Sequence, residues 1–223
     1  TPLYSSAASD VYKRQVKEDF LRPPRSLAEW CADSLRVLGI VGVGVALIWL
    51  APTDAGIAAL ALPALMLPRV LGLRGGFDLA VCATVLVAAW SNIFDLYRTI
   101  PGWDLVVHLI CTGILTIVAA LILTRAEVVT MTRDHGARPR TPLVLAPLLA
   151  LALSAMWEMV EWLGWAYLSD EIFVTYQDTI GDMVFGGLGG IAAGVILATS
   201  SLRRPRSTDG VGGSANRSRA GGT

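Results

Sequence analysis

The sequence predicts an all-α membrane protein, a polytopic bundle of about six transmembrane helices. Of its 223 residues, 54% are hydrophobic and only 16% are charged, whereas a soluble domain carries about 25% charged residues. Six apolar segments follow one another along the chain, and the arginines between them alternate from loop to loop. The formal net charge is zero, which argues against a nucleic-acid partner because such proteins carry a basic stripe. The partner that this composition predicts is the lipid bilayer.

The two ends of the chain differ from its centre. Residues 10–15 read DVYKRQ, which matches the translation of an adapter used in sequencing libraries, so we expect residues 1–15 to be a non-native scar. Residues 16–36 are predicted to be a cytoplasmic segment with a helix along the membrane surface. A capping box begins that helix, with Ser26 as N-cap and Glu29 reaching back. Residues 37–200 form the predicted six-span domain, and residues 201–223 a disordered cytoplasmic tail.

Each apolar segment is compared with the roughly 20 residues that a helix needs to cross a bilayer. The segments are residues 37–51, 55–67, 77–94, 103–124, 143–164 and 180–200. The second is short and contains Pro63 and Pro68, so a re-entrant hairpin is an alternative for it.

The distribution of arginines favours six crossings. Arginines lie before the first segment, between the second and third, between the fourth and fifth, and after the sixth; the other loops carry only Arg98. The positive-inside rule therefore places both termini in the cytoplasm, and the alternation requires residues 55–67 to cross. We expect a bacterial plasma (inner) membrane protein.

Ionisable residues inside the spans are the candidate functional groups, because they are costly in a bilayer. They occur in pairs that share a helix face, at a spacing of three or four residues. The pairs are Asp104 with His108, Glu158 with Glu161, and Asp178 with Asp182.

The depths of these residues suggest one site. A rise of 1.5 Å per residue places His108, Glu158, Glu161 and Asp182 about 22–27 Å from the cytoplasmic ends of their spans. Asp95, at the end of the third span, has the same depth, about 27 Å. That level is the outer third of a core about 30 Å thick, so the sequence predicts an outward-facing polar cluster.

Such a cluster cannot consist of carboxylate anions alone in a low dielectric. Either a cation lies among them or some carboxyl groups are neutral. Oxygen donors with one imidazole suit Zn²⁺, Mn²⁺, Fe²⁺ or Mg²⁺ better than copper. We assign His108, Glu158, Asp178 and Asp182 as metal ligands, and Glu161 and Asp104 as general bases. A proton or cation pathway and a purely structural hydrogen-bond network remain alternatives.

The last span also carries small residues at four-residue spacing, namely Gly186, Gly190 and Gly194. This spacing lets two helices approach closely in lipid. It predicts either packing inside the bundle or a homodimer through this face.

At these motifs the chain resembles the YjdF-like inner-membrane proteins of bacteria. The matching residues are 103–108 (WDLVVH), Glu158 with Glu161, and 178–183 (DTIGDM) before a glycine-rich helix. The resemblance covers about residues 36–200 and implies a multi-pass plasma-membrane protein, but no activity. A looser likeness to VanZ-like proteins lies in the order Asp, His, Glu and Asp. Those proteins commonly place Asn where this chain has Gly186.

Three hypotheses follow for function. The first is a metal-dependent membrane hydrolase or transferase that acts on an amphiphilic substrate of the cell envelope. The second is a proton- or cation-coupled transporter, which also uses intramembrane acids. The third is a non-catalytic scaffold in which the polar cluster only stabilises the fold.

Overall fold

The computed structural model describes residues 14, 17–169, 172 and 174–204. Within these residues the protein is all-α, and apart from an isolated bridge between Leu73 and Arg203 it contains no β-structure. Six of the described helices are long and apolar enough to cross a membrane. These are α2 (Leu27–Trp49), α3 (Pro52–Val70), α4 (Gly75–Ile93), α6 (Trp103–Arg125), α7 (Arg140–Tyr167) and α8 (Tyr176–Thr199). The predicted fold class is confirmed. Most of the predicted scar and disordered tail lies outside the described residues.

Five of the six long helices begin earlier than the predicted segments, and α2 begins ten residues earlier. Leu27–Trp49 forms one continuous helix, so Trp30 and Leu35 belong to the same helix as the first span. The Ser26 side chain accepts a hydrogen bond from the backbone N–H of Glu29, as predicted, but the Glu29 carboxylate accepts from the backbone N–H of Arg25 and does not complete the capping box. The second segment is a full 19-residue helix despite Pro63 and Pro68, so the re-entrant alternative is wrong.

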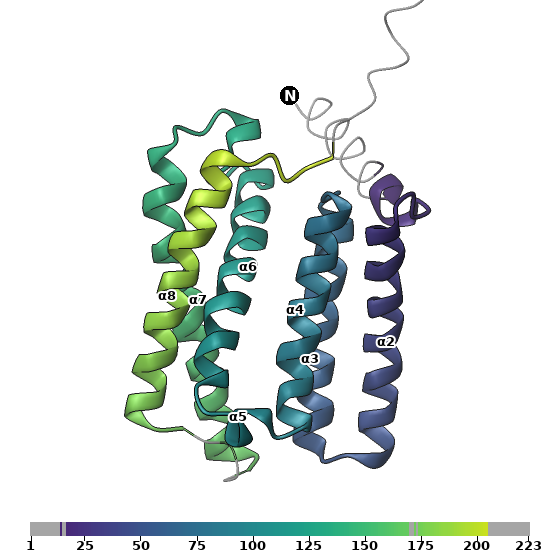
Figure 1. Ribbon diagram of the computed structural model, residues 1–223, viewed down its shortest axis with the longest axis vertical. Helices are drawn as coiled ribbons and strands as arrows, with labels where there is room; N and C mark the ends of the chain where they lie inside the picture. Colours follow the sequence, from purple (N-terminus) through teal and green to yellow (C-terminus); the bar gives the residue numbers. More distant parts are fainter. Residues whose placement is uncertain (1–13, 15–16, 170–171, 173, 205–223) are drawn as a thin grey trace, which may run out of the picture.

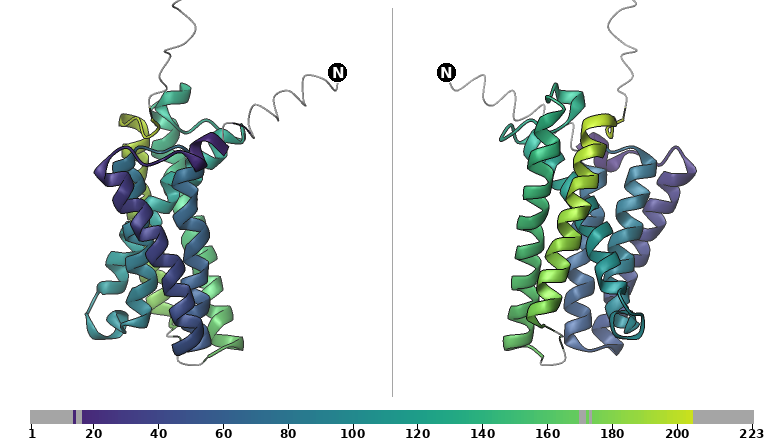
Figure 2. Two further views of the ribbon diagram at one scale, coloured as in Figure 1. Left: turned by 90° about the vertical axis from the view of Figure 1, so that its right-hand side faces the viewer. Right: turned by 60° about the vertical axis from the view of Figure 1, so that its left-hand side comes forward.

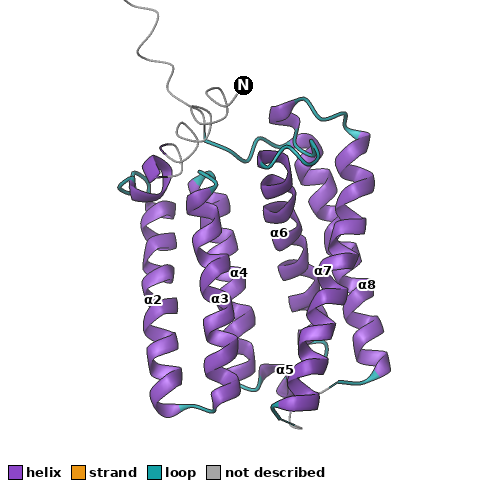
Figure 3. Ribbon diagram, turned by 180° about the vertical axis from the view of Figure 1, so that it is seen from behind, coloured by secondary structure: helices purple, strands orange, loops and turns teal. Residues whose placement is uncertain are grey.

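The bundle consists of two groups of three helices. Helices α2, α3 and α4 pack against one another, α6 and α7 both pack on α8, and α4 and α6 join the two groups. Figure 1 shows the groups side by side, and Figure 3 shows them from behind. The short helix α5 (Leu96–Thr99) lies in the connection between α4 and α6.

The two ends of the bundle have opposite character. At the basic end, where α2, α4 and α7 begin, lie arginines that include Arg69, Arg125 and Arg203. At the acidic end, α6 and α8 begin and α7 ends. The first described helices and the last described residues meet at the basic end (Figure 2), where Arg204 forms an ion pair with Glu29.

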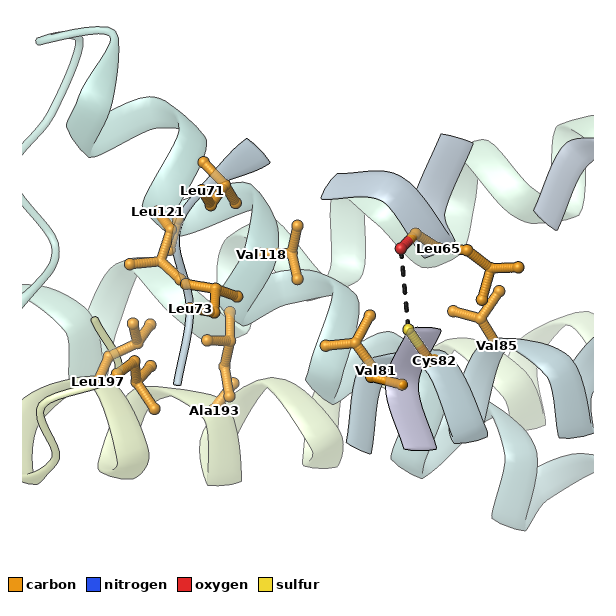
Figure 4. Packing of buried hydrophobic residues seen from close by; sticks show 14 of the residues in the cluster. Leu65, Leu71, Leu73, Val81, Cys82, Val85, Val118, Leu121, Ala193 and Leu197 are labelled. Carbon is orange, nitrogen blue, oxygen red and sulfur yellow. Dashed lines mark hydrogen bonds between the residues drawn. The ribbon is translucent and has the colours of Figure 1, made fainter. Parts of the chain in front are cut away.

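The hydrophobic core lies toward the basic end and joins both groups. Leu65, Val81 and Cys82 of the first group belong to the same buried cluster as Val118 and Leu197 of the second. Figure 4 shows these side chains, with the Cys82 thiol donating to the Leu65 carbonyl oxygen at 3.8 Å. In the second group, the buried ionisable residues of the described chain, His108, Glu158 and Asp182, lie at the acidic end instead.

Candidate functional site

Three helices deliver the predicted polar residues to the acidic end. Asp104 lies in the first turn of α6 and His108 one turn further in. Asp178 lies in the first turn of α8, where its N–H donates to the N-cap Thr175, and Asp182 follows one turn later. Because α7 runs in the opposite direction, its final third brings Glu158 to the same end.

The geometric centre of the cluster is a group of Asp104, His108 and Asp182. Each can offer one ligand atom, and these atoms all lie within 4.8 Å of one another. His108 Nε2 is 3.5 Å from Asp104 Oδ1 and 3.8 Å from Asp182 Oδ2. These separations are too long for hydrogen bonds. They match two ligands on one ion, because metal–ligand distances near 2.1 Å place neighbouring ligands roughly 3–4 Å apart.

Asp182 is buried and has no hydrogen-bond partner among the described residues. It is 1% exposed, and neither carboxylate oxygen has a hydrogen-bond partner among the described residues. Glu158, on α7, is 7% exposed and its Oε1 also has no partner there. A buried carboxylate without partners is costly, so the cluster requires a cation, protons or water to complete it.

The first group of helices shows a different solution for a buried acid. Asp78, on α4, is 2% exposed, and it accepts a hydrogen bond from Nη2 of Arg36 on α2. The same guanidinium donates to Asp33 at 2.7 Å and to the Leu65 carbonyl at 2.9 Å. This bundle therefore neutralises one buried acid with a cation of its own. The pair was not predicted, because the two residues are 42 positions apart in the sequence.

The remaining predicted residues lie around this centre. Glu161 and Asp178 are partly exposed and contribute no atom to the group of three. Asp104, which we assigned as a base, is one of the three residues of this group. Asp95 is not part of the cluster. Its side chain is 59% exposed and pairs with Arg98 at 3.8 Å, because α4 ends at Ile93 and the depth count assumed a longer helix.

Two aromatic side chains fix the start of α6 to the end of α4. The Trp103 indole N–H donates to Ser91 Oγ at 2.9 Å, and the Tyr97 hydroxyl donates to the Ala88 carbonyl at 2.8 Å. Burial raises the pKa of the Tyr97 phenol, so it stays protonated and keeps this donor. Asp104 directly follows Trp103, and the first group of helices thus helps to place it.

The face of α8 that carries Gly186, Gly190 and Gly194 packs against α7 of the same chain. A Cβ atom at Gly190 would lie 2.4 Å from Ala150 Cβ, and one at Gly194 would lie 2.8 Å from the Pro142 carbonyl. A Cβ atom at Gly186 would lie 2.0 Å from the Ser154 hydroxyl oxygen. All three contacts are with α7. This corrects the homodimer alternative, because the face has no room for a second copy.

The comparisons with known proteins agree with this architecture. Residues 33–203 match the family described as "Predicted membrane protein (DUF2238)". The YjdF-like resemblance is consistent with this family, and nothing in the match tests the likeness to VanZ-like proteins. No curated protein and no solved structure matches the chain.

Proposed function

We propose, for a chain that belongs to the DUF2238 family of predicted membrane proteins, that Asp104, His108 and Asp182 bind a divalent metal ion. The observation that carries this proposal is the Asp182 carboxylate, which is buried without a partner and lies 3.8 Å from a histidine nitrogen. The contrast with Asp78 supports it, because the same bundle supplies Arg36 to the other deeply buried aspartate.

The donor set favours particular ions. Two carboxylates and one imidazole suit Mn²⁺, Zn²⁺, Fe²⁺ or Mg²⁺, and they lack the soft sulfur ligands that select copper(I). Three protein ligands leave coordination positions for water or substrate, as in catalytic metal sites. Asp178, one turn before Asp182 on α8, and Glu158, on the neighbouring α7, are additional oxygen donors.

The arrangement supports hydrolysis or group transfer. A bound divalent ion acts as a Lewis acid and makes a water molecule more acidic. Glu158 or Glu161 accepts the proton of the attacking nucleophile, since both carboxylates lie on α7 beside the cluster. The exposed aromatic residues Trp157, Trp162 and Trp165 lie on the same stretch of α7. They suit the membrane surface, so we propose an amphiphilic substrate.

The packing of apolar side chains in the half of the bundle toward the basic end favours a binding or catalytic site over a transport path. Toward the basic end, α6 presents Ile117, Val118 and Leu121, which are at most 5% exposed. Ala193 and Leu197 of α8 belong to the same cluster. The buried polar groups of α6 in this half are the hydroxyls of Thr116 and Thr124. None of the buried ionisable side chains of the described residues of α6, α7 or α8 lies there, whereas an ion or proton path normally continues through such groups.

Metal analysis tests the proposal directly. We expect purified protein to retain about one divalent ion per chain, and His108→Ala to lose it, because the imidazole lies between the two carboxylates. His135→Ala is the matched control, since His135 is the other histidine of the chain and lies in the 3₁₀ helix at the basic end. Elemental analysis after gel filtration measures both. Metal-free wild-type protein that also fails to bind added Mn²⁺ or Zn²⁺ would contradict the proposal.

We also propose that the basic end faces the cytoplasm of a bacterial cell, as the positive-inside rule requires. Exposed Asp95 and Arg138 lie at opposite ends of the bundle. With Cys31 and Cys111 replaced by alanine, we expect an impermeant maleimide to label Asp95→Cys in intact cells and Arg138→Cys only after lysis. The reverse pattern would overturn the orientation.

A further inference from the structure

A second set of polar side chains lies one helical turn below the cluster, toward the basic end. Thr112 follows His108 by four residues on α6, and Gly186 follows Asp182 by four on α8. On α7, which runs the other way, Ser154 precedes Glu158 by four. Thr112 and Ser154 are buried, and Ser154 is 1% exposed. We call these two side chains the hydroxyl layer.

Gly186 creates the space in which the hydroxyl layer forms. A Cβ atom there would lie 2.0 Å from Ser154 Oγ and 3.3 Å from Thr112 Oγ1. Side chains of α6 and α7 therefore meet over the bare backbone of α8. The contact joins the same three helices that carry the cluster above.

The Ser154 hydroxyl has no partner among the described residues. A serine in a transmembrane helix commonly donates to the carbonyl four residues earlier in its own helix. Here the hydroxyl instead points at α8, beside Gly186. A nearly fully buried hydroxyl in this position, directly below unpartnered carboxylates, indicates a missing polar ligand.

We propose that the hydroxyl layer is the inner wall of the ion site and that Ser154, with Thr112, holds a water molecule bound to the ion. This inference rests on the proposed function. A metal–water bond of about 2.1 Å and a hydrogen bond of about 2.8 Å together cover most of the 5.4 Å turn that separates the two sets. The site then selects a hard cation that retains water, such as Mg²⁺ or Mn²⁺.

The test measures Mn²⁺ affinity of the purified full chain by titration calorimetry. We expect Ser154→Ala to weaken Mn²⁺ binding about 10- to 100-fold, the range for groups that support a metal ligand without touching the ion. Zn²⁺ affinity should change less, because Zn²⁺ needs no retained water. The metal-free melting temperature should not fall, since the substitution removes an unpartnered hydroxyl.

Gly186→Ala provides a second, independent variant. Its methyl group would occupy the position of the Ser154 hydroxyl, which can rotate away, so this variant should lose the same Mn²⁺ affinity. Adding Ser154→Ala should then cause little further loss, because both changes remove one interaction. Gly187→Ala is the control, since its Cβ meets only the Leu151 side chain, at 3.1 Å.

The outcomes separate the two proposals. If wild-type protein binds Mn²⁺ and Ser154→Ala binds it equally well, the hydroxyl layer has no role and the ion site stands. If Gly187→Ala weakens binding as much as Gly186→Ala does, the effect is general packing and the inference fails. If wild-type protein binds no divalent ion, the proposed function fails and this inference fails with it.

Discussion

Gly189→Ala is expected to destabilise the bundle more than alanine at any other glycine of α8. A Cβ at this position would lie 2.1 Å from the Leu109 carbonyl oxygen and 3.0 Å from the Gly113 backbone nitrogen. Both atoms belong to the backbone of α6, so neither can rotate away. Helices α6 and α8 would have to separate, and we expect a loss of about 3 kcal/mol, at the upper end of the usual range for overpacking.

Gly44→Ala is the matched control for this prediction. Gly44 lies inside α2, and no atom lies within 4 Å of the Cβ it would gain. Alanine there should stabilise the helix by about 0.5–1 kcal/mol, because it restricts the unfolded chain. Thermal unfolding in detergent measures both variants. A Gly189→Ala protein as stable as Gly44→Ala would mean that the close contact between α6 and α8 does not exist in solution.

The six spans were predictable because they depend on properties of single segments. Apolar length and the alternation of arginines between loops require no knowledge of which helices are neighbours. The same reasoning brought Asp104, His108 and Asp182 to one level, since it needed only the direction of each span and the rise per residue. Asp95 lies at the same end but outside the cluster, because the chain leaves α4 before it and turns into a left-handed conformation with φ 54°.

Contacts between helices could not be read from the sequence. The glycine spacing in α8 fits either a second copy or a neighbour in the same chain, and only the fold shows that α7 occupies the face. Arg36 and Asp78 are 42 positions apart, and no pattern along the chain connects them. The hydroxyl layer could not be predicted for the same reason, because it depends on the contact of Ser154 with Gly186 on another helix.

The two groups of helices share an arrangement that explains where their polar residues lie. In the first group, Arg36 lies in the third turn of α2 and Asp78 in the first turn of α4. In the second, His108 and Asp182 lie near the starts of α6 and α8. The first cluster contains its own guanidinium cation. The second contains a histidine between acids and, in our proposal, takes its cation from solution.

This difference predicts opposite effects for two equivalent substitutions. Asp78→Asn should cost about 3–5 kcal/mol, because it leaves the buried Arg36 guanidinium without its main counterion. Asp182→Asn should maintain or raise the stability of metal-free protein, because the buried carboxylate has no hydrogen-bond partner among the described residues. Thermal or denaturant unfolding of both variants with a chelator present measures this contrast.

Added metal should make wild-type protein more stable than the Asp182→Asn variant. Wild-type protein at a Mn²⁺ concentration of about 100 times Kd should gain about 2.7 kcal/mol from binding, while Asp182→Asn should gain little. The variant is then at least as stable as wild type in chelator and less stable in Mn²⁺. A structural hydrogen-bond network cannot produce such a change of sign, because its contribution does not depend on metal. Asp182→Asn destabilised equally in both conditions would therefore favour the scaffold hypothesis over an ion site.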